Sequence, residues 1–583
     1  MILNFGKFFL ILLPLFLLTG CAGGQRIQFD KSITLSRAVI PVRYERKAPS
    51  VNSSAYYHFL LSQILLREGK IDQAIEELKK AVSYDDREPL LHVELATLYV
   101  HKGLLNEAIE EGQAALRQDP GLLSAHLILG GAYSSLKKTP LAIEEYKKVI
   151  EIDPEHREGY LYLAYLYADD REYDQAVRIL QDFLKRTPDS IMHLYALGKV
   201  YMEMKSYEEA EKYFLKALAI EPYITPVLMD LGLVYEMRNE PEKAIEVYQK
   251  ILAQDPDHKR ARSRLGQIYL KEKKLDQALD QFREIQKTDA EDLNIRTKMG
   301  LIYLEQGKLD QAILEFNFVL AAHPEEDRVR FYLAAAFVEK GSLEQALSEF
   351  KKIPSSSALF SDSMRSITLI LRKENRTEEA LRILEEAIRK KPQEGDLYLI
   401  LGGLLEKENQ LEKALATLQK GLDRNQENVD LHFQMGAVYD KLGNFERMVA
   451  QMKEVLRLNP EHADALNYLG YSYAERGVNL GEALALIQKA MALKPDSGYI
   501  TDSLGWVHYK MGDYEKAVAE LEKASRLTPD DPTISEHLGD SYLKLKRIQK
   551  AVEFYERALT LDPKSDQGER LKSKIQELKR EKK

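Results

Sequence analysis

Apolar and polar positions along this chain recur at an interval of 34 residues. Within each interval they follow the period of two short amphipathic helices, with apolar residues three and four apart. Tyrosine recurs at this interval at Tyr133, Tyr167, Tyr201, Tyr235, Tyr269 and Tyr303. Alanine recurs at the same interval from Ala74 to Ala414. Proline recurs at Pro120, Pro154, Pro188, Pro222 and Pro256. The pattern predicts about fifteen helical hairpins between Ala55 and Ser565.

Small residues accompany the tyrosines. Gly198, Gly232, Gly266 and Gly300 each stand three residues before one of them. Where two antiparallel helices cross closely, one must present a small residue so that an aromatic ring of its neighbour fills the space. Proline lacks an amide hydrogen and disfavours helix at the preceding residue, so it separates one hairpin from the next. Stacked hairpins share one continuous core.

The 34-residue spacing, the small and aromatic pair, the alanine and the closing proline together resemble the tetratricopeptide repeat. This resemblance implies an all-α fold, a right-handed αα-superhelix of about fifteen helix-turn-helix repeats. After the repeats, Leu571, Ile575 and Leu578 form an apolar stripe in an otherwise charged segment. Solenoids need a polar outer face at their ends, so this segment is expected to be a capping helix.

The predicted organisation is a lipoprotein signal peptide at 1–20, a lipidated cysteine with a flexible tether at 21–54, nine repeats at 55–360, six repeats at 361–565 and the capping helix at 566–583. The division inside the array follows from Pro354, which interrupts a second helix. We interpret Pro354 as a hinge. A shortened helix without mechanical consequence is the alternative.

The single cysteine, Cys21, indicates where the protein is located. An apolar run from Phe8 to Leu18 is too short to span a bilayer and is typical of a secretory signal. The string Leu18-Thr19-Gly20-Cys21 resembles a bacterial lipobox. This implies cleavage before Cys21 and its lipidation, and Ala22 in the next position points to the outer membrane, facing the periplasm. An ordinary signal with a chance cysteine is the alternative.

Composition and motifs argue against several classes of function. A net charge of −9 gives no reason to expect nucleic acid. No nucleophile elbow, phosphate-binding loop, dinucleotide fingerprint or zinc motif appears in the sequence, so we expect no enzyme, cofactor, metal or small-molecule substrate. Four histidines, His58, His92, His126 and His432, share one place in their repeats, and we interpret them as packing residues.

Helical spacing places five residues of two neighbouring first helices on one face. They are Asn467, Tyr471, Asp502, Trp506 and Tyr509. Aromatic rings beside a carboxylate and an amide are typical of interface hot spots, so this ledge is a candidate protein-binding site. A possible second patch consists of Tyr165, Met192, Tyr195, Met202, Met229 and Leu233. In both places packing between neighbouring repeats is the alternative.

The lipobox, the repeats and the phrases that begin at Leu466 and Asp502 resemble long bacterial tetratricopeptide lipoproteins. Some of those proteins tether carboxy-terminal processing proteases at the outer membrane and deliver peptidoglycan hydrolases to them. The resemblance implies a non-catalytic scaffold for a periplasmic protease, a cell-wall hydrolase, or both. Assembly or export of type IV pili or extracellular polysaccharide, and a helper subunit of an enzyme complex, are the alternatives.

Overall fold

The computed structural model describes residues 52–562 and 566–581. The predicted signal peptide, Cys21 and all but the last residues of the predicted tether lie outside these ranges. Within them the chain forms 31 helices and no strand, so the predicted all-α fold of fifteen hairpins and one final helix is confirmed.

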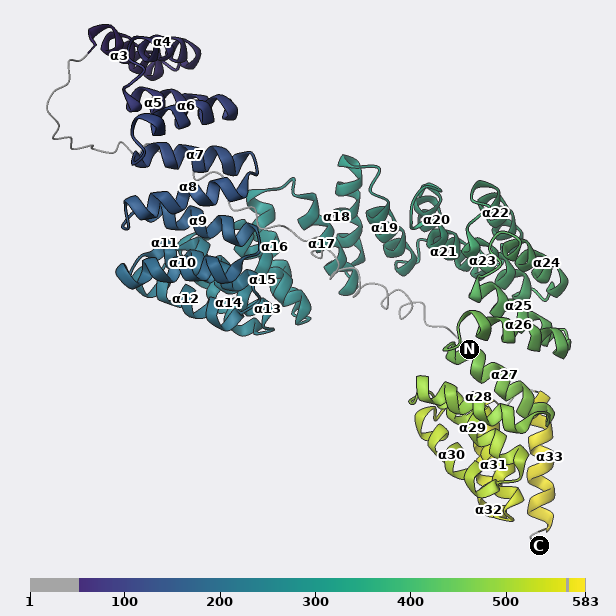
Figure 1. Cartoon of the computed structure of the whole chain (residues 1–583). Helices are drawn as coiled ribbons and strands as arrows, with labels where there is room; N and C mark the ends of the chain where they lie inside the picture. The colour runs from purple at the N-terminus through teal and green to yellow at the C-terminus, as the bar shows by residue number, and fades with distance from the viewer. Residues whose placement is uncertain (1–51, 563–565, 582–583) are drawn as a thin grey trace. The chain divides into compact units, whose positions relative to one another are not determined.

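Each hairpin consists of a first helix and a second helix, and within each of the two units described below the two lie side by side in Figure 1. The helices are α3 (Ser53–Arg67), α4 (Ile71–Tyr84), α5 (Pro89–His101), α6 (Leu105–Gln118), α7 (Leu123–Ser135), α8 (Thr139–Ile152), α9 (Arg157–Asp169), α10 (Tyr173–Arg186), α11 (Ile191–Glu203), α12 (Tyr207–Ile220), α13 (Thr225–Met237), α14 (Pro241–Gln254), α15 (Lys259–Lys271), α16 (Leu275–Thr288), α17 (Leu293–Glu305), α18 (Leu309–Ala322), α19 (Asp327–Glu339), α20 (Leu343–Lys351), α21 (Phe360–Lys373), α22 (Thr377–Lys390), α23 (Gly395–Lys407), α24 (Leu411–Leu422), α25 (Val429–Lys441), α26 (Phe445–Leu458), α27 (Ala463–Arg476), α28 (Leu480–Leu493), α29 (Gly498–Met511), α30 (Tyr514–Leu527), α31 (Pro532–Lys544), α32 (Ile548–Leu561) and α33 (Asp566–Glu581).

The described repeats belong to two compact units. One ends at Ile302 and the other begins at Tyr303, within α17. In both, each hairpin packs against the next one along the chain, and the buried side chains form one cluster after another. The predicted boundary at residue 360 remains a prediction.

The recurring glycines lie where two helices of one hairpin cross. A Cβ on Gly232 would lie 2.5 Å from Cε1 of Tyr248, and a Cβ on Gly266 would lie 2.5 Å from Cε1 of Phe282. Such distances are too short for any side chain, so the glycines are required by the rings that face them. These rings are on the second helices, sixteen residues after each glycine, and they are not the recurring tyrosines of the first helices.

The tyrosines that recur every 34 residues connect one hairpin to the preceding one. Nε2 of Gln113 on α6 donates to the hydroxyl of Tyr133 on α7 at 3.0 Å. The hydroxyl of Tyr235 on α13 donates to Glu211 on α12 at 2.8 Å. The buried ring thus packs between repeats while its polar end reaches an exposed edge of the neighbouring second helix.

Every hairpin turn contains a residue with positive φ just after the first helix, and the turn between α27 and α28 contains a second one, Asn479. The residues that follow the first helices recur every 34 residues, with one interval of 35 between Gly477 and Gly512, and are Gly69, Gly103, Lys137, Arg171, Lys205, Asn239, Lys273, Gly307, Gly341, Asn375, Asn409, Gly443, Gly477, Gly512 and Lys546. The left-handed conformation ends the first helix and frees the chain to reverse direction. Five of these positions carry lysine or arginine, for which this conformation is unfavourable, so the packing of the two helices must stabilise the turn.

The four histidines that share one register bind the second helix of their own hairpin. Nδ1 lies 2.6 Å from a carboxylate oxygen of Glu77, Glu111 or Glu145 for His58, His92 and His126, and 2.6 Å from the amide oxygen of Gln451 for His432. In His126, Nε2 also lies 3.1 Å from the carbonyl oxygen of Pro120 in the turn between repeats. These contacts hold a hairpin together and tie it to the turn before it.

The helix before Pro354 is shorter than its counterparts. Helix α20 ends at Lys351 after nine residues, whereas most second helices have fourteen. The amide of Ser357 donates to the carbonyl oxygen of Pro354 at 3.0 Å, which forms a turn before α21. Ile353 is buried beside this turn and Pro354 is exposed. Whether the segment acts as a hinge remains a prediction.

The last helix covers the end of the second unit. Leu571, Ile575 and Leu578 of α33 are buried in one cluster with residues of α31 and α32, while Lys572 and Lys579 remain exposed. This is the polar-backed capping helix that the apolar stripe predicts.

Candidate protein-binding site

Three first helices, α27, α29 and α31, form a wall in the second unit, with α29 in contact with both others. Trp506 of α29 lies at its centre. Its ring stacks on His537 of α31 at 3.8 Å between centroids and on Tyr509 at 4.6 Å. The indole Nε1 donates to Oε2 of Glu475 on α27 at 2.5 Å. Trp506 is therefore held by all three helices, and only 6% of it is exposed.

A buried ion pair supports this stack. Nδ1 of His537 lies 2.9 Å from Oδ1 of Asp502, and both side chains are buried. Burial lowers the pKa of His537, but the charge of Asp502 and the hydrogen bond to it outweigh burial, and the net pKa is raised. The imidazole is thus favoured in its charged form beside the carboxylate. The pair keeps the His537 ring parallel to the indole.

Lys510 of α29 contacts both the Trp506 ring and Glu475. Nζ of Lys510 lies 4.9 Å from the centroid of the Trp506 ring and donates to the carbonyl oxygen of Glu475 at 2.8 Å. The ammonium also lies 3.4 Å from Oε2 of Glu475. A cation over an indole face is an attractive arrangement, and here it joins the end of α27 to α29.

Tyr471 and Asn467 lie one and two turns before Glu475 on α27, and both are half-buried. The Oδ1 atom of Asn467 is buried and has no hydrogen-bond partner. Burial raises the pKa of the Tyr471 hydroxyl, whose ring lies 6.4 Å from that of His537. An unpaired buried acceptor costs folding free energy, so a bound donor at Asn467 would recover part of that cost.

The structure therefore divides the predicted ledge into two parts. Asp502 and Trp506 are buried within the wall, and Asn467, Tyr471 and Tyr509 are half-buried at its surface. Packing within the wall accounts for the burial of Asp502 and Trp506. The role of the five residues in binding a protein remains a prediction.

Sequence reasoning missed Glu475, Lys510 and His537. Glu475 continues the spacing of Asn467 and Tyr471 by four residues, and Lys510 continues that of Trp506 in the same way. Extending the helical stripe by one turn would have found both. His537 lies one repeat later, and only packing brings it against Trp506.

The possible second patch lies in the other unit and is also partly buried. Met202 and Met229 are buried, Tyr165, Tyr195 and Leu233 are half-buried, and Met192 is exposed. The hydroxyl of Tyr195 donates to Oδ2 of Asp230 at 2.7 Å. Burial raises the pKa of Tyr165 to about 12. A binding role for this patch also remains a prediction.

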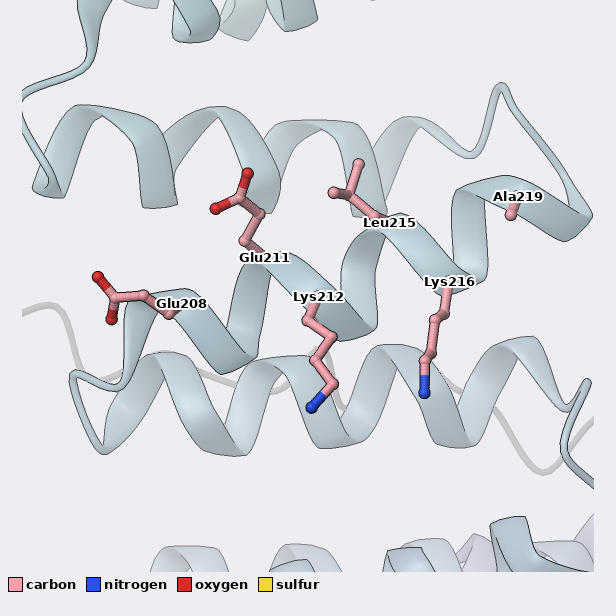
Figure 2. A pocket seen from close by; sticks show the side chains of 6 residues that line it. All are labelled: Glu208, Glu211, Lys212, Leu215, Lys216 and Ala219. Atoms are coloured by element: carbon pink, nitrogen blue, oxygen red, sulfur yellow. The ribbon is translucent and has the colours of Figure 1, made fainter.

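A shallow hollow lies on the second helix α12. Glu208, Glu211, Lys212, Leu215, Lys216 and Ala219 line it, and Figure 2 shows these side chains along one helix, with Lys212 and Lys216 extending in the same direction. Glu211 is engaged by Tyr235 and Arg238 of the next hairpin. Mixed charges on one open helix face do not enclose a ligand.

The described residues also bear on metal binding and on membrane-spanning helices. No group of three or more histidine, cysteine, aspartate or glutamate side chains there is arranged to hold a metal ion. No described helix has the length and apolar character needed to cross a bilayer. The predicted lipidation at Cys21 and the predicted location lie outside what these residues can test.

Stacked helical hairpins with a wall of first helices define a repeat protein of the protein-binding class. The chain belongs to the tetratricopeptide repeat family. Three family models described as tetratricopeptide repeat match residues 59–122, 297–358, 433–498 and 503–566, residues 235–302 and 371–435, and residues 189–257. A model described as anaphase-promoting complex, cyclosome, subunit 3, matches residues 135–217.

The chain is also similar to individual proteins. A TPR repeat-containing protein of Pseudomonas aeruginosa is 52% identical over 48 residues, which is 8% of either chain. Yeast Tom70 has a TM-score of 0.34 at 15% identity, covering 91% of this chain and 96% of that one. A tetratricopeptide repeat protein from Parabacteroides merdae has a TM-score of 0.33 at 20% identity, covering 43% of this chain and 99% of that one. These likenesses concern repeats and fold and carry no argument about partners.

Proposed function

We propose that this protein is a non-catalytic scaffold that holds other proteins in the bacterial cell envelope, anchored through a lipid on Cys21. The observation that carries the scaffold role is the wall of α27, α29 and α31, where half-buried Asn467, Tyr471 and Tyr509 surround a rigid core. Rigid aromatic groups with few rotamers lose little entropy on binding, and the unpaired Oδ1 of Asn467 selects for a donor.

The proposed partner is a periplasmic carboxy-terminal processing protease, its cell-wall hydrolase substrate, or both, and the proposed location is the periplasmic face of the outer membrane. The resemblance of the lipobox and of the phrases at Leu466 and Asp502 to long tetratricopeptide lipoproteins supports this choice. Such a scaffold would raise the effective concentration of a substrate near its protease without performing chemistry itself.

The test is crosslinking mass spectrometry on intact cells that carry the full chain. We expect a protease or hydrolase to be crosslinked to residues of α27 or α29, and this crosslink to be lost in the double variant Asn467→Leu, Tyr471→Ala. Leu527→Ala, an exposed position on the second helix α30, is the control and should retain the crosslink. Partners that are unchanged in the folded double variant would contradict the site.

The anchor has a separate test. Cys21→Ser should release the protein from the membrane fraction, because several buried acyl chains contribute about 0.8 kcal/mol per methylene. A Cys21→Ser variant that stays membrane-bound after a salt wash would contradict lipid anchoring, whatever the crosslinking result.

A further inference from the structure

The first described helix presents an apolar face that nothing in the described residues covers. Tyr56, Tyr57, Leu60 and Ile64 of α3 follow helical spacing on one side, and all four are exposed. The exposed fraction is 61% for Tyr57 and 53% for Ile64. A contiguous apolar patch rarely remains open on a soluble domain.

The repeat register shows what this face corresponds to. One repeat later, Leu91 and Leu98 take the places of Tyr57 and Ile64, and they are 7% and 4% exposed. In α13 the same places are held by Val227 and Val234, which are 1% and 0% exposed. There the preceding hairpin covers them. The face of α3 is therefore a repeat-to-repeat interface without a described neighbour.

A hollow lies beside this face, between the first two helices. Leu61 and Leu65 of α3 and Asp72, Gln73, Glu76 and Glu77 of α4 line it. One repeat later, the counterparts of the two leucines are Leu95 and Tyr99, and both are buried. The hollow thus has an apolar floor and a margin with three carboxylates, each of which already pairs with a lysine, Glu76 with Lys79, Glu77 with Lys80 and Asp72 with Lys102.

The two ends of the described array differ. Helix α33 ends the array with buried leucine and isoleucine on one face and exposed lysines on the other. At α3 the outward side is apolar, so this end requires a cover that the other end already has.

We propose that residues 26–44 of this same chain dock on the open face of α3 and over the hollow. This segment contains Ile27, Phe29, Ile33, Leu35, Val39, Ile40 and Val42. It also carries four basic side chains and one acidic side chain. Burying even part of this apolar area contributes roughly 25 cal/mol per Å².

Connectivity favours this occupant over a second copy. Asn52 caps α3, with Oδ1 accepting from the amide of Ser54 at 3.1 Å, and Nδ2 donates to the carbonyl oxygen of Tyr84 at 2.6 Å. The residues before Asn52 are therefore attached next to the face. Helix α3 is about 22 Å long, a distance that roughly seven extended residues span. A segment tethered so closely has an effective concentration in roughly the millimolar range.

Hydrogen–deuterium exchange on the purified full chain tests the proposal. In Ile33→Asp, Leu35→Asp, we expect amides of residues 53–67 to exchange about tenfold faster than in wild type, because charges expel the segment from the apolar face. Thr34→Asp, Ser36→Asp adds the same charge at the intervening polar positions and should leave exchange unchanged. These substitutions lie outside the repeats, so the array remains folded. Equal exchange in wild type and the Ile33, Leu35 variant would overturn the proposal.

Lysine crosslinking identifies the occupant. We expect links from Lys31 to Lys79 or Lys80 within one chain, measured in a mixture of ¹⁴N-labelled and ¹⁵N-labelled protein. Mixed-isotope links, or protection of α3 that rises with protein concentration, would assign the face to a second copy. Protection that requires a co-purified protein or a vesicle would assign it to that partner. Each of these results would overturn docking of the chain's own segment.

Discussion

The ring of Phe214 occupies the space that a side chain on Gly198 would need. A Cβ on Gly198 would lie 2.5 Å from Cε1 of Phe214, and the two residues are on α11 and α12 of one hairpin. The contact recurs with Tyr248 and Phe282 in the next two hairpins. The close crossing of two helices is thus the conserved unit of the array within this chain.

Gly198→Ala should destabilise its hairpin by about 1–3 kcal/mol, because the Phe214 ring must move to admit a methyl group. Thermal unfolding followed by circular dichroism measures this. Gly131→Ala is the control, since a Cβ there would lie 3.8 Å from the Tyr146 hydroxyl, which is an ordinary contact distance. An equal loss in both variants would contradict the packing argument.

Lys137→Gly should stabilise the protein by about 1 kcal/mol. Lys137 has φ of 57° in a hairpin turn, and glycine adopts this region without the steric cost that a lysine carries. Gly103→Lys, at the equivalent turn one repeat earlier, should lower the unfolding temperature for the same reason. A Lys137→Gly variant that unfolds earlier than wild type would show that side-chain contacts dominate at this turn.

The first repeats should lose stability as pH rises above about 6.5. The hydrogen bond to Glu145 raises the pKa of His126 against the opposing effect of burial, and Glu111 does the same for His92. A raised pKa in the fold means that the stabilisation is complete at pH below the unfolded value and is lost as pH rises through the folded value.

His126→Tyr should remove most of this local dependence. The substitution removes the imidazole, and Tyr160, at the same place one repeat later, donates to the equivalent turn carbonyl, that of Pro154, at 3.3 Å. Exchange rates of amides in α7 between pH 6 and pH 8, corrected for intrinsic rates, measure the effect. His432→Tyr is the control, because the partner of His432 is the neutral Gln451. Identical pH profiles for wild type and His126→Tyr would contradict the assignment.

Trp506 is the single tryptophan, so its fluorescence reports on the wall directly. Glu475→Ala leaves the indole Nε1 without its partner and should lower the stability of this region by about 1 kcal/mol. Glu475→Gln keeps an acceptor and should lose less. Denaturant titration followed by tryptophan emission distinguishes the two. An Ala variant as stable as the Gln variant would show that water replaces Glu475.

Asn467→Leu should leave stability unchanged or increase it slightly. The Oδ1 atom of Asn467 is buried without a partner, so its removal relieves a desolvation cost and adds apolar contact. Thermal unfolding measures this, and Asn459→Leu is the control. Asn459 accepts from the amide of Glu461 through Oδ1 at 3.1 Å, and its loss should destabilise the turn. Marked destabilisation by Asn467→Leu would show that Asn467 serves the fold rather than a partner.

Much of the architecture follows from the sequence alone. The hairpins are predicted by the interval between Tyr133 and Tyr167 and by the recurring prolines, and the final helix by the apolar stripe at Leu571, Ile575 and Leu578. The structure confirms both. Such periodic signals survive because each repeat contacts only its neighbours, so a local pattern specifies local packing. The identity of the filling ring, Phe214 rather than Tyr201, did not follow from the pattern.

The sequence by itself determined the number of hairpins, their spacing and the residue classes at their crossings, because these depend on helical period and residue size. Only the tertiary structure decided that Trp506 is enclosed by Glu475 and His537, and that no described residue covers the face of α3 while its counterparts in later repeats are covered. The exposure of a side chain at a given repeat position depends on the side chains with which the neighbouring hairpin covers it. Those side chains lie about a full repeat away in the sequence.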